Sequence, residues 1–253
     1  MGGRIGGAGV YRGEDGAIRS GTDYRDTSGH GTAIAAVIRH VAPDADLFAL
    51  KIFNGALATT PDILEAALSY ALQAGARVVN LSLGMAASTY ASPLHSLCGE
   101  AAKAGIVLVS SARNGSNDAG VPASYDEVIG VRGDARLADD TLVYRSGDPI
   151  ECLASPWPRS LPGLSRERNF RGNSFAAARV SGAIACLLEE YPDASLPTLR
   201  EVLSERYGRG RCTKPEMRHC YMRPSHFRES AHAEGPGGRA RNRYKNGIYI
   251  TNQ

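Results

Sequence analysis

Short apolar segments alternate with helical segments along most of this chain, and this alternation limits the possible folds most strongly. Apolar runs separated by helices of about 10–15 residues are typical of a parallel sheet that is covered on both faces. We therefore expect an α/β fold with a mostly parallel sheet. The expected strands lie at 46–53, 78–83, 106–109 and 128–131, and the expected helices begin near residues 30, 61, 94, 174 and 197. Residues 1–29 are expected to form turns with a short strand near Ile5 or Val10, and 132–171 are expected to be rich in loops.

Charge divides the chain into two parts. Residues 1–204 carry 18 basic and 22 acidic side chains, whereas 205–253 carry 11 basic and 4 acidic ones. We expect a domain over 1–205 and a basic, Gly/Arg-rich, partly disordered tail over 206–253. Metal binding by the Cys and His residues of this tail, or nucleic-acid binding by its arginines, are the less favoured interpretations.

Three polar residues stand where a parallel α/β sheet places its functional groups. His30 opens one buried helical stretch, Ser174 opens another, and Asn114 follows a buried strand. Each has a simpler explanation alone, as a turn residue or a helix N-cap. Together they supply the base, the nucleophile and the amide donor that acyl transfer requires.

Five motifs of the chain resemble the subtilisin-like serine proteases, the subtilase family, in order and spacing. The resemblance covers roughly residues 1–205 and implies a subtilisin-like three-layer sandwich. The five motifs are Asp26–Thr32 around the histidine, Val79–Gly84, Val107–Asn114, Val121–Val131 and Gly172–Leu188 around the serine.

The resemblance assigns a role to each candidate residue. Ser174 would attack the scissile carbonyl, His30 would accept its proton, and Asn114 with the Ser174 N–H would bind the oxyanion. The segment Ser82-Leu83-Gly84 would line the specificity pocket and align an extended peptide.

The aspartate of the family's catalytic triad has no match in this sequence. Asp15, Asp23 and Asp26 lie among turn residues, without a buried strand leading to any of them. The opening residues instead resemble the stretch that follows the aspartate motif, so we expect the chain to be N-terminally incomplete. The aspartate strand lies centrally in the family's sheet. We therefore expect either poor stability, or another segment or second chain that fills the slot and supplies the acid.

Two further positions depart from the family pattern. Arg113 stands where relatives usually have glycine, beside the expected specificity pocket. It could block the pocket, favour an acidic substrate residue or point to solvent. Ala178-Arg179 replaces the usual Pro-His pair, a change that we expect to be harmless.

The resulting hypothesis is a serine endopeptidase that acts through an acyl-enzyme on Ser174. The alternative is a catalytically impaired subtilase-like module that binds extended peptides or a partner. An unrelated dinucleotide-binding protein is disfavoured, because no G-x-G-x-x-G opens a helix. We expect peptide or protein substrates, no nucleic acid, no membrane and no cofactor, with a structural calcium ion allowed only by the resemblance. No signal peptide is visible, which favours the cytoplasm if the start is genuine.

Overall fold

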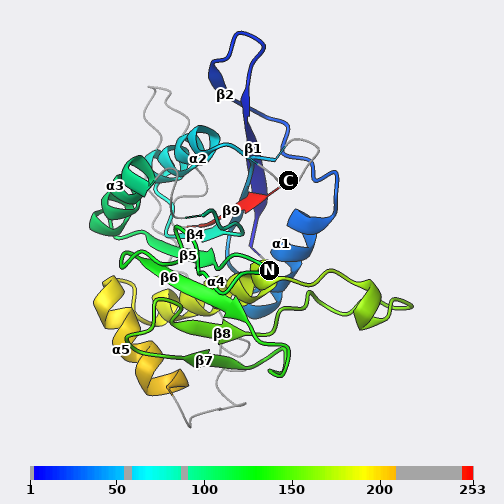
Figure 1. Ribbon diagram of the computed structural model, residues 1–253, viewed down its shortest axis with the longest axis vertical. Helices are drawn as coiled ribbons and strands as arrows, with labels where there is room; N and C mark the ends of the chain where they lie inside the picture. Colours follow the sequence, from blue (N-terminus) through cyan, green and yellow to red (C-terminus); the bar gives the residue numbers. More distant parts are fainter. Residues whose placement is uncertain (1–2, 54–58, 87–90, 209–246, 253) are drawn as a thin grey trace, which may run out of the picture.

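A single nine-stranded sheet runs through the computed structural model, which describes residues 3–53, 59–86, 91–208 and 247–252 (Figure 1). The strand order is β2-β1-β3-β9-β4-β5-β6-β8-β7, and every pairing is parallel except the outer pairs β1–β2 and β7–β8. The strands are β1 Ile5–Arg12, β2 Ile18–Gly21, β3 Leu47–Lys51, β4 Val78–Leu81, β5 Val107–Ser111, β6 Val128–Gly133, β7 Leu142–Tyr144, β8 Cys152–Ala154 and β9 Ile248–Asn252.

Helices cover both faces of this sheet and enclose two apolar cores. Side chains of α1, α4 and α5 pack on one face, and those of α2 and α3 pack on the other. The helices are α1 His30–Val41, α2 Pro61–Ala74, α3 Ala91–Lys103, α4 Asn173–Glu190 and α5 Leu196–Tyr207, with a 3-10 turn η1 at Arg166–Arg168. The expected α/β architecture with a mostly parallel sheet is therefore confirmed.

The helix boundaries follow local signals in the sequence. Pro61 stands in the first turn of α2, where its missing N–H costs nothing. Gly75 ends the same helix in the left-handed conformation, with φ of 71°. Helix α4 is buried almost all round, and its Ala and Gly residues let it lie close to the sheet and to α1.

The expectation of loops over 132–171 is only partly right, because this stretch contains β7, β8 and η1. The two strands are three residues long each, too short to show an alternating pattern. At the other edge of the sheet, β1 is eight residues long and forms a hairpin with β2, where a single short strand was expected.

A strand at the centre of the sheet is formed by residues that were expected to belong to the partly disordered basic tail. Strand β9 lies between β3 and β4, and it is parallel to both, with Leu47 opposite Ile248 on one side and Val78 opposite Ile248 on the other. Its side chains at positions 248–251 are at most 2% exposed. Thus the expected vacant slot at the middle of the sheet is filled by the last residues of the same chain (Figure 1).

Residues 248–252 form a strand instead of part of the expected tail. One property of this segment is local, and the other depends on distant strands. Ile-Tyr-Ile-Thr is rich in β-branched and aromatic residues, which suit a strand. Its pairing partners, however, lie about 170 to 200 positions earlier in the chain, and such pairing leaves no periodic signal. Residues 209–246, which include Cys212, Cys220 and most of the basic charge of the tail, lie outside the described residues.

No helix in the described ranges is long and apolar enough to cross a membrane.

Candidate active site

The three predicted catalytic residues lie at the carboxyl edge of the sheet. His30 is the first residue of α1, Ser174 is the second residue of α4, and Asn114 follows the carboxyl end of β5. His30 and Ser174 are buried, at 9% and 5% exposure. The first-turn N–H groups of α4 have no acceptor within the helix, so the helix presents them and its positive dipole end beside Ser174.

Asn114 is held directly against the start of the serine helix. Its Oδ1 accepts a hydrogen bond from the backbone N–H of Asn173 at 3.0 Å. A Cβ on Gly172 would lie 3.4 Å from the Asn114 Nδ2. The amide nitrogen of Asn114 therefore lies next to the turn that carries Ser174, which is where an oxyanion donor is needed.

Asn173 connects the serine turn to the segment that follows β5 and to the end of β6. Its Nδ2 donates to the carbonyls of Ala112 and Arg113 at 2.9 and 3.2 Å. Its Oδ1 accepts from the N–H of Gly133, at the end of β6, at 2.9 Å. Sequence reasoning missed this residue, since an Asn before a helix is ordinarily read as a cap.

A buried polar network links Ser174 to the central strand. The Ser174 hydroxyl donates to the carbonyl oxygen of Ser82 at 3.4 Å. The Ser82 N–H donates to Thr251 Oγ1 at 3.3 Å, and that hydroxyl donates to the carbonyl of Asn80 at 3.2 Å. Strand β9 therefore holds in place the backbone of Ser82, to which the candidate nucleophile is bonded. Sequence reasoning also missed Thr251.

The imidazole of His30 lies among aromatic rings and lacks an acid partner. Its centroid is 5.4 Å from that of Phe175 and 6.0 Å from that of Phe170. Within the described part of the chain, its buried Nδ1 has no hydrogen-bond partner, and no hydrogen bond joins His30 to Ser174. Burial lowers the pKa of His30 below its ordinary 6.5, and the Asp26 carboxylate, which raises it, offsets only part of that effect.

The three aspartates upstream of His30 are bonded elsewhere. Asp26 accepts hydrogen bonds from the N–H groups of Ser28, Gly29 and Thr32, which hold the entry to α1. Burial would raise the pKa of Asp26, but these hydrogen bonds outweigh it and keep the pKa below its usual value. Asp15 pairs with Arg19, and Asp23 pairs with Arg25.

The predicted substrate segment follows β4 at the same edge. Ser82 is buried, and its Oγ accepts from Asn80 Nδ2 at 2.7 Å. The carbonyl of Leu83 accepts from the hydroxyls of Ser110 and Ser111 at 3.3 and 3.4 Å. Gly84 lies against Arg113, so the structure brings these residues together beside Asn114.

The buried side chain of Arg179 links α4 to two loops through hydrogen bonds and an ion pair. Its guanidinium donates to the carbonyls of Asp139 and Trp157 at 2.8 and 2.5 Å, and it forms an ion pair with the Asp139 carboxylate at 3.2 Å. Its side chain is 6% exposed. Arg179 departs from the family pattern, and it therefore introduces a buried positive charge. Its N–H groups are hydrogen-bonded to the surrounding backbone carbonyls.

We expect Arg179→Ala to lower the free energy of unfolding by about 2–4 kcal/mol, since it leaves buried carbonyls without donors. Denaturant unfolding of the full chain measures this loss. Arg136→Ala is the matched control, because the Arg136 side chain is 86% exposed and, among the described residues, pairs only with Asp134. Equal stability of the two variants would show that Arg179 is not a structural tie.

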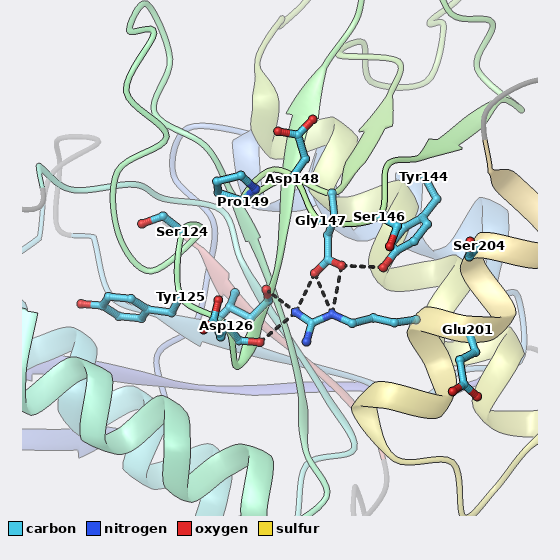
Figure 2. Close-up of a pocket in the computed structure, with 13 residues that line it drawn as sticks. Ser124, Tyr125, Asp126, Tyr144, Ser146, Gly147, Asp148, Pro149, Glu201 and Ser204 are labelled. Carbon is cyan, nitrogen blue, oxygen red and sulfur yellow. Dashed lines mark hydrogen bonds and ion pairs between the residues drawn. The ribbon is translucent and has the colours of Figure 1, made fainter.

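A cavity of about 540 Å³ lies at the opposite, amino edge of the sheet beside α5 (Figure 2). Arg200 and Glu151 form an ion pair within it: Arg200 binds Glu151 through Nε and Nη2, and the Tyr144 hydroxyl donates to Glu151 at 2.9 Å. Arg200 also donates to the carbonyl of Asp126 at 2.8 Å. These contacts anchor α5 to the sheet.

The described residues contain no group of three or more His, Cys, Asp or Glu side chains that could hold a metal ion.

Serine, histidine and asparagine at the carboxyl edge of a parallel sheet define a candidate hydrolase site of the serine class. Residues 7–219 match the model of the subtilase family, and the chain belongs to this family of serine proteases. Subtilisin DY from Bacillus licheniformis is 30% identical over 208 residues, with 73% of each chain covered. A thermostable alkaline protease from Halalkalibacterium halodurans is 28% identical over 210 residues, covering 74% of this chain and 55% of that protein.

Solved structures show the same fold. Sphericase superposes with a TM-score of 0.62 at 22% identity, covering 81% of this chain and 79% of its own. Fervidolysin from Fervidobacterium pennivorans, described as a keratinolytic enzyme related to subtilisin, gives 0.58 at 24% identity, covering 80% of this chain and 36% of its own. The subtilisin-like architecture is therefore established for this chain.

Proposed function

We propose that this chain is a serine endopeptidase that cleaves peptide bonds through Ser174. The Ser174 Oγ forms a bond to the scissile carbonyl carbon while His30 takes its proton, and the Asn114 amide with the Ser174 N–H binds the oxyanion. The C–N bond then breaks, and the amine leaves with the proton from His30. Water hydrolyses the resulting ester by the same steps. The observation that supports this proposal most strongly is the Asn114 side chain against Gly172 and Asn173 at the start of α4.

A second candidate is the impaired module that binds extended peptides or a partner. It is favoured by the His30 Nδ1, which is buried without a partner, and by the Ser174 hydroxyl, which donates to Ser82. Loss of the acid that orients the imidazole costs on the order of 10⁴-fold in related triads. We therefore expect slow turnover, with the binding of peptide retained.

An upstream segment or a second chain that supplies the missing aspartate is a further part of the proposal. The slot at the centre of the sheet is occupied by β9, whose five residues include no Asp or Glu. A strand that brings the acid to this position would have to displace β9. Such an exchange would convert a slow enzyme into a fast one.

The test is the hydrolysis of an internally quenched peptide by the full chain, beside a Ser174→Ala variant prepared identically. We expect a low rate that depends on Ser174 and increases with pH, because only neutral His30 can accept the proton. Since burial lowers the pKa of His30, the midpoint of this increase should lie below 6.5. An equal rate for the Ser174→Ala variant would favour the peptide-binding module instead.

A further inference from the structure

Arg113 is held between two backbone segments beside the candidate oxyanion donor. The Arg113 N–H donates to the carbonyl of Ala119 at 3.0 Å. Met85 and Val121 pair through two hydrogen bonds of 2.8 and 2.9 Å, which bring the segments after Gly84 and Gly120 together. These hydrogen bonds fix the backbone of Arg113 and the two segments beside it.

The stem of Arg113 fills the space that two glycines leave open. A Cβ on Gly84 would lie 3.0 Å from the Arg113 Cγ, and a Cβ on Gly120 would lie 2.5 Å from its Cδ. Gly120 also has a φ of 69°, which disfavours any side chain there. This packing directs Arg113 over the segment that the family resemblance assigns to the specificity pocket, so the side chain does not simply point to solvent.

The guanidinium retains most of its hydrogen-bonding capacity. Among the described residues its one partner is Asp118, at 3.4 Å, and the two side chains are 35% and 54% exposed. An exposed pair at this distance contributes little and is readily exchanged for another carboxylate. A guanidinium has five N–H donors and binds a carboxylate through two of them at once.

We propose that Arg113 selects peptides with Asp or Glu at the residue whose carbonyl group Ser174 attacks. The inference rests on the proposed function of this site. Arg113 precedes Asn114 in the chain, and its carbonyl accepts from Asn173 Nδ2 at 3.2 Å, so its backbone lies at the serine turn. On this proposal the carboxylate of the same substrate residue reaches the Arg113 guanidinium. The arginine stem occupies the space beside both glycines, at 3.0 Å or less from the position that a Cβ on Gly84 or Gly120 would take.

The charge of a neighbouring segment favours the same substrates. Residues 157–172, which lead directly into the serine turn, contain four arginines and one glutamate. Arg166 and Arg171 each lie over the Trp157 ring, at 5.1 and 5.2 Å from its centroid. Arg166 is also paired with Asp139, and the remaining positive charge of this segment increases the rate at which acidic peptides arrive.

The test measures equilibrium binding to the full chain carrying Ser174→Ala, so that no peptide is consumed. Three labelled polyalanine octapeptides are compared, which differ only in one central residue: Glu, Gln or Leu. We expect the Glu peptide to bind on the order of tenfold tighter than the Gln peptide at low salt, as a charge-assisted bond requires. Arg113→Gln should remove this preference, and Arg136→Gln, at an exposed arginine paired with Asp134, should leave it unchanged.

Equal binding of the Glu and Gln peptides, or no measurable binding of the Glu peptide, would overturn the proposal. A gain in binding of the Leu peptide in Arg113→Gly, without any Glu preference in the parent, would show that Arg113 only blocks the pocket. Failure of the proposed function has a different signature, because the Glu preference would then persist while no reaction depends on Ser174.

Discussion

Removal of residues 247–253 is expected to abolish cooperative unfolding of this chain. Strand β9 pairs with β3 and β4, so its loss exposes the backbone donors and acceptors of two neighbouring strands. Ile248, Tyr249 and Ile250 are at most 2% exposed. Burial of three such side chains contributes roughly 5–8 kcal/mol, comparable to the roughly 5–15 kcal/mol that holds a typical domain folded.

Thermal unfolding followed by circular dichroism checks this expectation, with a synthetic peptide of residues 245–253 added back in excess. The peptide should restore a cooperative transition, and a control peptide with Asp at both isoleucine positions should not. If the shortened chain unfolds cooperatively at the temperature of the full chain, β9 is not part of the core.

The second large effect is expected from Asn114→Asp. This change keeps an oxygen that can accept from the Asn173 N–H, but it replaces the amide donor with a negative charge. Loss of one oxyanion donor slows acyl transfer by on the order of 10²–10³-fold. The Ser174-dependent rate of reaction with a fluorophosphonate should decrease by at least this factor, while the unfolding temperature stays near that of the parent chain.

Two control variants distinguish the loss of the amide donor from a general disturbance of the loop that carries Asn114. Asn114→Ala should be slow as well, whereas Asn117→Ala, in the same loop, should react at the parental rate. A rate for Asn114→Asp within threefold of the parent would exclude Asn114 from the oxyanion site.

Local signals allowed much of the framework to be predicted from the sequence. The spacing of apolar residues and the Pro61 and Gly75 boundaries predicted α2, and continuous apolar runs predicted β4, β5 and β6. Such signals lie within a dozen residues, and each depends on backbone geometry that the residues themselves prefer. The same reasoning placed the three candidate catalytic residues at strand ends and helix starts.

Features that depend on distant partners were not predictable in this way. Strand β9 is stabilised by pairing with β3 and β4, and five residues at the end of a basic segment give no sign of that pairing. The roles of Asn173 and Thr251 depend on carbonyl and N–H groups of other strands. Arg179 is satisfied by carbonyls of two loops, which no pattern in α4 anticipates.

Fluorophosphonate labelling of the full chain, followed by mass spectrometry of its peptides, tests the central claim most directly. The reagent bonds covalently only to a nucleophile that the site activates. We predict a single modified residue, Ser174, whose labelling is lost in His30→Ala and slowed in Asn114→Asp. Labelling at another residue, or an unmodified Ser174 after prolonged exposure, would contradict a serine peptidase site in this chain.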